Sequence, residues 1–97
     1  MPYEIILAPE AMEDFKRLKA PIRATVKAAL NTYLRHGPAK ASRSRIKRLR
    51  GLSRPQYRLR IDEIRVSYDI TGTTVEILAI VPKPEAQRWL AQFGNLE

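Results

Sequence analysis

The stretch KASRSRIKRLRGLSRPQYRLRIDEIRVSYD, residues 40–69, decides the fold that the sequence predicts. In its second half apolar and basic residues alternate, with Tyr57, Leu59 and Ile61 on one parity and Arg58 and Arg60 on the other. The same period continues over residues 64–70. A two-residue period is typical of strands with one buried face. Residues 56–61 and 64–70 therefore predict an antiparallel hairpin, turned at residues 62–63, with its arginines on the face away from the core.

The same stretch carries the charge of the chain. Ten of the eighteen lysines and arginines lie in residues 40–65 against two acidic residues, so the local balance of +8 (ten minus two) equals the net charge of the whole chain. This indicates a polyanionic partner: nucleic acid, an acidic protein segment or an anionic membrane surface. A solvated basic face is the alternative, but such a face needs no two-residue period. The membrane is disfavoured because no basic amphipathic helix with bulky exposed apolar residues accompanies the charge.

The rest of the chain predicts two further strands, a helix pair and a last helix. Residues 3–7 predict the first strand, and residues 9–19 and 21–36 predict helices with apolar residues at spacings of three and four. A short strand is predicted near residues 46–49, inside a basic loop. Residues 75–81, VEILAIV, predict a strand in the middle of a sheet. Residues 84–93 predict a helix that ends at Gly94.

The predicted fold is therefore α+β, in the order β-α-α-β-β-β-α, as a single domain over residues 1–97. One small antiparallel sheet carries the N-terminal helix hairpin on one face. We expect the opposite face, with Arg58, Arg60 and Arg65, to be open. The sequence leaves the position of the C-terminal helix undecided, and this helix could cover part of the open face.

Composition excludes several classes of site. The absence of cysteine and the single histidine, His36, exclude a disulfide framework, thiolate metal sites and imidazole clusters. We expect no metal and no cofactor, and His36 fits a cation at a helix C-terminus better than a catalytic group. The apolar runs are too short to cross a bilayer, and the first fifteen residues lack the features of a signal peptide. The default expectation is a cytoplasmic protein without a membrane partner.

The arginines of the predicted hairpin suggest chemistry on RNA. Guanidiniums fixed on adjacent strands form a rigid site for phosphate. RNA cleavage needs neither a metal nor a protein nucleophile, because the 2′-hydroxyl can attack the adjacent phosphate while arginines stabilise the developing charge. A proton carrier must come from another group, and Lys83, Lys47 and Glu85 are the nearest candidates in the sequence. Trp89 can stack on a base or anchor the last helix in the core.

Several motifs resemble the RelE/ParE superfamily of bacterial and archaeal toxins. They are Leu49-Arg50-Gly51, Tyr57-Arg58-Leu59-Arg60, Arg65-Val66-Ser67-Tyr68, and the apolar strand 75–81 followed by Lys83. With the helix pair before them, these motifs cover nearly the whole chain. The resemblance implies a microbial RNase-like RelE fold and the toxin of a type II toxin-antitoxin system. In the RelE branch such a toxin is an mRNA interferase that cuts mRNA in the ribosomal A site.

The resemblance also implies the site residues, position by position. The matching basic residues form an expected catalytic set: Arg58, Arg60, Arg65 and Lys83. The expected contacts to RNA or the ribosome are Lys47, Arg48, Arg50, Arg54 and Trp89. The chain departs from the family pattern where arginines replace two strand lysines. It also departs where Pro84 follows Lys83 in place of an arginine, and where Trp89-Leu90 stand near a position often held by a tyrosine. The general base therefore stays open.

Partners follow from the same resemblance. We expect a cognate acidic antitoxin that neutralises the toxin, the ribosome with its mRNA as target, and operator DNA only through the antitoxin complex. The alternative on the same fold is a ParE-like inhibitor of DNA gyrase without nuclease activity. Cleaved gyrase–DNA complexes without cut mRNA would distinguish the second function from the first.

Overall fold

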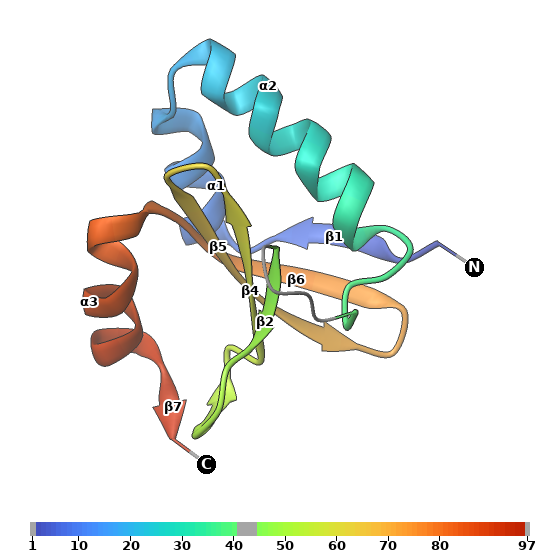
Figure 1. Ribbon diagram of the computed structural model, residues 1–97, viewed down its shortest axis with the longest axis vertical. Coiled ribbons are helices and arrows are strands. Elements are labelled where there is room, and N and C mark those ends of the chain that lie inside the picture. The colour runs from blue at the N-terminus through green and yellow to red at the C-terminus, as the bar shows by residue number, and fades with distance from the viewer. Residues whose placement is uncertain (1, 41–44, 97) are drawn as a thin grey trace.

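The computed structural model describes residues 2–40 and 45–96, and its helices flank a central sheet (Figure 1). In chain order they are β1 (Glu4–Leu7), α1 (Pro9–Arg17), α2 (Ala20–Ala29), its π-helical continuation η1 (Leu30–Leu34), β2 (Ile46–Arg48), β3 (Leu52–Arg54), β4 (Tyr57–Ile61), β5 (Ile64–Thr71), β6 (Thr74–Pro82), α3 (Lys83–Phe93) and β7 (Asn95–Leu96). None of the helices in these two ranges is long and apolar enough to cross a membrane.

The main sheet has the strand order β1-β6-β5-β4-β2, and every pair is antiparallel except β1 with β6. The predicted hairpin is present: β4 and β5 pair from Tyr57 with Tyr68 to Ile61 with Ile64. Its two-residue turn contains Asp62 in the left-handed region, at φ 50°. Aspartate tolerates this conformation, which explains how the turn forms without glycine. The sequence did not predict β3 and β7, which pair as a separate two-stranded sheet.

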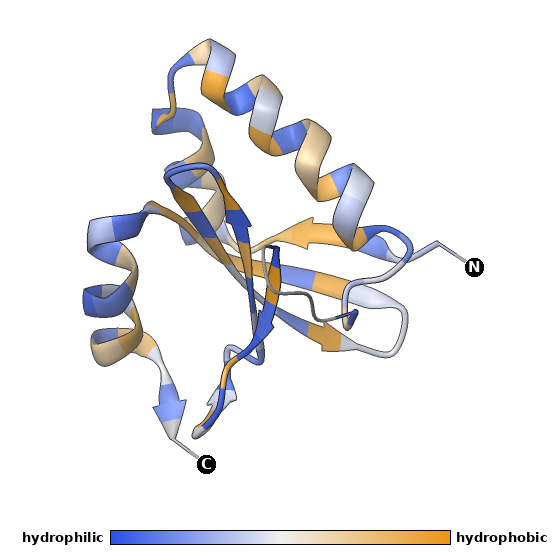
Figure 2. Cartoon of the chain, viewed as in Figure 1, coloured by the Kyte–Doolittle hydropathy of each residue, from blue (hydrophilic) through white to orange (hydrophobic). Residues whose placement is uncertain are grey.

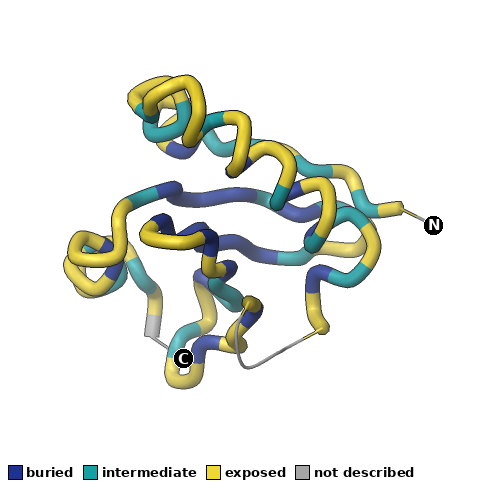
Figure 3. Tube along the Cα trace, turned by 45° about the horizontal axis from the view of Figure 1, so that its top comes forward, coloured by how far each residue is buried: buried dark blue, intermediate teal, exposed yellow. Residues whose placement is uncertain are grey.

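The core lies between the sheet and the α1–α2 pair. Alternation along β4 and β5, visible as blue and orange bands in Figure 2, places Leu59 and Val66 in this core, both fully buried. Val26 of α2 and Leu34 of η1 meet them from the helical side. The central strands are accordingly the most buried part of the chain (Figure 3).

The second face of the sheet is covered in part, where an open face was expected. Helix α3 packs on β6 and β5, and Ala79 of β6 is fully buried. The reason lies in the composition of β6, which is apolar on both parities, so both of its faces must be removed from water. The part of this face formed by β4 and β2 carries basic side chains.

Asp14 of α1 completes the hydrogen bonding of β6. A bulge at Leu78 shifts the register, so that Ser67 opposes Ala79 and Tyr68 opposes Ile77. Strand β1 ends opposite Ile77, so the following part of β6 has no strand partner on that side. The Ile80 N–H donates instead to Oδ2 of Asp14, at 3.1 Å.

Replacing Asp14 by alanine should lower the free energy of unfolding by about 1–3 kcal/mol, because the buried Ile80 N–H loses its acceptor. Asp14→Asn retains an oxygen acceptor and should recover most of this loss. Glu13→Ala, one position earlier and exposed, is the matched control and should stay within about 0.5 kcal/mol of the wild type. Urea unfolding measures the free energy of unfolding of all three variants. Equal losses of this free energy in Asp14→Ala and Glu13→Ala would contradict the role of Asp14.

Tyr68 links the hairpin to the segment that follows the helices. Its ring is fully buried and stacks on Tyr57 with centroids 5.5 Å apart, and its hydroxyl donates to the Pro38 carbonyl at 2.6 Å. Burial, and to a lesser degree the neighbouring Tyr57, raises the pKa of the Tyr68 phenol well above its usual range. The phenol therefore stays protonated in the folded protein.

This shift predicts a loss of stability at alkaline pH. Above about pH 10 the unfolded chain releases the phenolic proton and the folded chain retains it, so stability falls as pH rises. Tyr68→Phe should cost about 1–3 kcal/mol at pH 7, because the Pro38 carbonyl loses its donor, and should show a shallower fall between pH 9.5 and 11. Urea unfolding across this range measures the difference. Identical pH slopes in the two proteins would rule out the proposed titration.

Candidate nucleic-acid interface

The β4–β5 hairpin and the edge strand β2 bring four basic residues to one face of the sheet. Arg58 lies opposite Lys47 on β2 and opposite Ser67 on β5, and Arg60 lies opposite Arg65. Directly opposed residues of an antiparallel pair share a face. Lys47, Arg58, Arg60 and Arg65, named here the strand cluster, therefore converge as the alternation predicts. Lys47 and Arg60 are exposed and Arg58 is half-buried.

Arg65 differs from the other members because it is only 7% exposed. Its Nη1 donates to the carbonyls of Asp62, at 2.7 Å, and Ile64, at 3.0 Å, which closes the hairpin turn. Burial and the nearby positive charges of Arg60 and Arg58 lower the pKa of the Arg65 guanidinium. Arg65 thus positions the hairpin, whereas Arg58 and Arg60 present their charge to solvent.

A groove of about 650 Å³ runs between the strand cluster and α3. It is named here the basic groove, and its lining residues are Lys47, Leu52, Arg58, Gln87, Leu90, Ala91 and Gly94. Its described lining includes two cations and no carboxylate. Lys83 lies outside this lining, at the start of α3, where its N–H donates to the Glu63 carbonyl of the hairpin turn at 2.7 Å. A groove with this charge can hold an anion such as a phosphate group.

The remaining predicted contact residues lie elsewhere. Arg54 is bound to two carboxylates, Asp69 at 3.0 Å and Glu76 at 3.1 Å. Burial raises the pKa of the Asp69 carboxyl, while the Gln56 N–H and Arg54 oppose that rise. Arg48 lies over the ring of Tyr57 at 5.3 Å.

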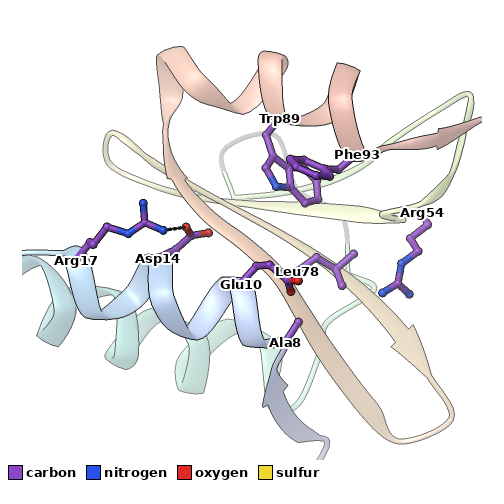
Figure 4. A pocket seen from close by; sticks show the side chains of 8 residues that line it. All are labelled: Ala8, Glu10, Asp14, Arg17, Arg54, Leu78, Trp89 and Phe93. Carbon is purple, nitrogen blue, oxygen red and sulfur yellow. Dashed lines mark hydrogen bonds and ion pairs between the residues drawn. The ribbon is translucent and has the colours of Figure 1, made fainter.

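Trp89 lines a second pocket and is not among the described residues that line the basic groove. The second pocket measures about 430 Å³, lies between α1 and α3, and is lined by Ala8, Glu10, Asp14, Arg17, Arg54, Leu78, Trp89 and Phe93 (Figure 4). Within it the rings of Trp89 and Phe93 are 5.6 Å apart. Arg50 is exposed in the turn between β2 and β3. The structure therefore brings Lys47 to the strand cluster and places Arg48, Arg50, Arg54 and Trp89 apart from it.

Comparison with known proteins identifies the family. Residues 5–86 match the family model of the ParE toxin of the type II toxin-antitoxin system parDE. The chain belongs to this toxin family. The superfamily predicted from the sequence motifs is therefore confirmed. No curated protein sequence matches this ParE-family toxin.

Solved structures with the same fold include toxins in complex with antitoxins. The toxin-antitoxin complex RelBE2 from Mycobacterium tuberculosis contains a chain with 27% identity and a TM-score of 0.69, with 84% of this chain and 92% of that chain covered. The RelE–RelB complex from Pyrococcus horikoshii OT3 (18% identity, TM-score 0.65, 89% and 100% covered) and the YoeB dimer from Staphylococcus aureus (22%, 0.60, 79% and 92%) share the fold. The predicted α+β, RelE-like fold is thus confirmed.

The acidic residues and the histidine of this ParE-family toxin do not gather into a metal site in the part of the chain that the structure describes. Within the described ranges no group of three or more histidine, cysteine, aspartate or glutamate residues could hold a metal ion. Sequence reasoning missed Gln87 and Leu90 as groove residues. Leu90 directly follows Trp89 in the sequence, and the sequence could not indicate that these two neighbours line different pockets.

Arg65→Gln should lower the free energy of unfolding by about 1–3 kcal/mol, because the Asp62 and Ile64 carbonyls lose a charged donor. Arg60→Gln removes the same charge from an exposed position of the adjacent strand and should change stability by less than about 0.5 kcal/mol. Urea unfolding of both variants tests the distinction between a positioning and a presenting arginine. Equal free energies of unfolding for the two variants would contradict this distinction between Arg65 and Arg60.

Proposed function

We propose that this toxin is a metal-independent endoribonuclease that cuts translated mRNA in the ribosomal A site, by directing the 2′-hydroxyl of RNA at the adjacent phosphate. The observation that carries the proposal is the convergence of Lys47, Arg58 and Arg60 on one face, with Lys47 and Arg58 lining the basic groove. Cations gathered on one face would bind the phosphate and stabilise the charge that develops on its oxygens.

The general base is the second part of the proposal. Arginine is a poor proton acceptor, so another group must accept the 2′-hydroxyl proton. Of the three candidates Lys47, Lys83 and Glu85, only Lys47 is among the described residues that line the basic groove. We assign this step to Lys47, whose neutral amine would accept the 2′-hydroxyl proton and whose ammonium would return a proton to the leaving 5′-oxygen. Lys83, beside the hairpin turn, would be a further contact for the RNA backbone.

Partners and location belong to the same proposal. Two of the similar solved structures, RelBE2 from Mycobacterium tuberculosis and RelE–RelB from Pyrococcus horikoshii OT3, are complexes of a toxin with its antitoxin. A cognate acidic antitoxin would neutralise the toxin by covering the strand cluster through charge complementarity, and operator DNA would be bound only through that complex. A ribosomal target places the active toxin in the cytoplasm.

The charge-reversal variant Arg58→Glu/Arg60→Glu should abolish growth arrest and lower mRNA cleavage at least 100-fold, because loss of a single oxyanion-stabilising donor costs about 10²–10³ in rate. Primer extension on translated mRNA, with and without the protein, measures the cleavage. Arg88→Glu, which reverses one exposed charge on α3, is the control for a charge reversal outside the strand cluster and should cut normally. Unchanged cleavage by a folded double variant would contradict the proposal.

A second candidate function is inhibition of DNA gyrase, and the match of residues 5–86 to the ParE model favours it. The absence of a carboxylate or histidine from the described groove lining favours it as well, because an inhibitor needs no proton carrier. Cells expressing the toxin would then accumulate cleaved gyrase–DNA complexes and show no cut mRNA. That result would replace the nuclease proposal.

A further inference from the structure

The pocket between α1 and α3 has no part in the proposed cleavage, and it is named here the aromatic pocket (Figure 4). Trp89 and Phe93 project toward it from α3, with Glu10 and Leu78 on its other side. Phe93 keeps 56% of its surface exposed. Aromatic side chains that stay open to water beside a cavity of about 430 Å³ are typical of a site that anchors another molecule.

The apolar surface of the aromatic pocket continues along the edge strand β1. Ala8 lines the pocket, and Ile6, two residues earlier in the extended chain, lines a further hollow of about 300 Å³ and is 46% exposed. Glu76 also lines this hollow and is bound to Arg54 of the aromatic pocket at 3.1 Å. The two hollows therefore form one elongated surface, which suits several consecutive side chains of a polypeptide better than a compact small molecule.

The charge around the aromatic pocket is opposite in sign to the net charge of the chain. Among its lining residues Arg54 is bound to two carboxylates and Arg17 to one, that of Asp14, so these groups sum to −1 (two positive and three negative). Glu10 makes no ion pair in the part of the chain that the structure describes, and it brings the balance to −2 on a chain of +8.

This arrangement favours a cationic ligand over an anionic one. Both arginines of the lining are already held by neighbouring carboxylates, so an anion would have to displace one of these carboxylates. A cation meets the Glu10 carboxylate directly. The basic groove has the opposite preference, because its described lining holds two cations and no carboxylate.

An arginine side chain fits both the charge and the rings of the aromatic pocket. A guanidinium over the face of tryptophan or phenylalanine is attracted by the ring quadrupole, and arginine makes this contact more often than lysine does. The donors of the same planar group can bind the Glu10 carboxylate. The apolar stem of an arginine can pack on Leu78 while the charged end stays in contact with water.

We infer that the aromatic pocket is a docking site for a segment of a partner protein, which inserts an arginine beside Trp89 and Glu10 and lays apolar side chains toward Ile6. The inference holds for an RNase and for a gyrase inhibitor alike, because the aromatic pocket and the basic groove share no described lining residue. A partner that covers both surfaces must change charge along its length, from acidic at the strand cluster to basic at the aromatic pocket.

Trp89 is the only tryptophan of the chain, so its fluorescence reports on the aromatic pocket. The probes are two blocked peptides of the sequence SALAXALAS, one with arginine and one with glutamate as X. The arginine peptide should change the Trp89 emission in a saturable manner. It should bind about tenfold more tightly than the glutamate peptide, since a cation–π contact and an exposed ion pair contribute about threefold each.

Two pairs of variants locate the contact. Glu10→Gln should reduce the preference for arginine to about threefold, because only the contact with the rings remains. Glu13→Gln removes the same charge from an exposed position of α1 outside the pocket lining and should keep the preference at about tenfold. Phe93→Ala should weaken binding of the arginine peptide at least about fivefold, whereas Met12→Ala, exposed and outside the lining, should not. Far-UV circular dichroism checks that each variant is folded.

Three results would overturn the inference: a glutamate peptide that binds as tightly as the arginine peptide, a Trp89 emission that the arginine peptide leaves unchanged at millimolar concentration, or equal losses of preference in Glu10→Gln and Glu13→Gln. A fourth is a Trp89 emission that shifts with the concentration of the protein alone, together with a dimer in sedimentation. That result would make a second copy of the chain the occupant and overturn the assignment to a partner protein.

Discussion

The arginine-bearing face of the sheet depends on a balance between buried apolar side chains and mutually repelling cations. Arg60 opposes Arg65, and Arg58 opposes Lys47, and like charges placed directly across a strand pair destabilise a sheet by up to about 1 kcal/mol each. On the other face of the same strands, Leu59 and Val66 are fully buried, and each such side chain contributes about 1.5–3 kcal/mol. Apolar burial is therefore the larger effect, and it holds the cations together at fixed spacing.

Helix α3 divides the second face into two environments with different chemistry. On one side Trp89 and Phe93 form a pocket with α1, where Arg54 is held by Asp69 and Glu76. On the other side Leu90 and Gln87 form a wall of the basic groove. The charge of Arg54 is thereby paired within the protein, whereas Arg58, on the next strand along the chain, lines a groove whose described lining holds no acidic partner. Two arginines four residues apart thus have different roles.

The sequence predicted the parts of this structure that follow from local periodicity. Alternation over residues 57–70 gave the hairpin, its turn and the shared face of Arg58, Arg60 and Arg65. It could not show that Arg65 bends back to the carbonyls of Asp62 and Ile64, because that contact depends on the turn geometry. It also could not predict that Asp14, a helical residue 66 positions before Ile80, supplies the acceptor that β1 does not reach. Long-range polar contacts leave no period in the sequence.

The composition of the basic groove bears on how the proposed cleavage would be catalysed. Leu90 lines the groove near a position where the family pattern often has a tyrosine, and an apolar side chain neither donates nor accepts a proton. In that proposal the described lining of the groove would contribute positive charge and one lysine, so much of the rate would have to come from alignment of the 2′-hydroxyl with the phosphate. Holding reacting groups in line is worth about 7–11 kcal/mol when the geometry is fully imposed. Under the proposed function, a second surface that holds the flexible strand in line over the open groove, the ribosome, would supply part of this alignment.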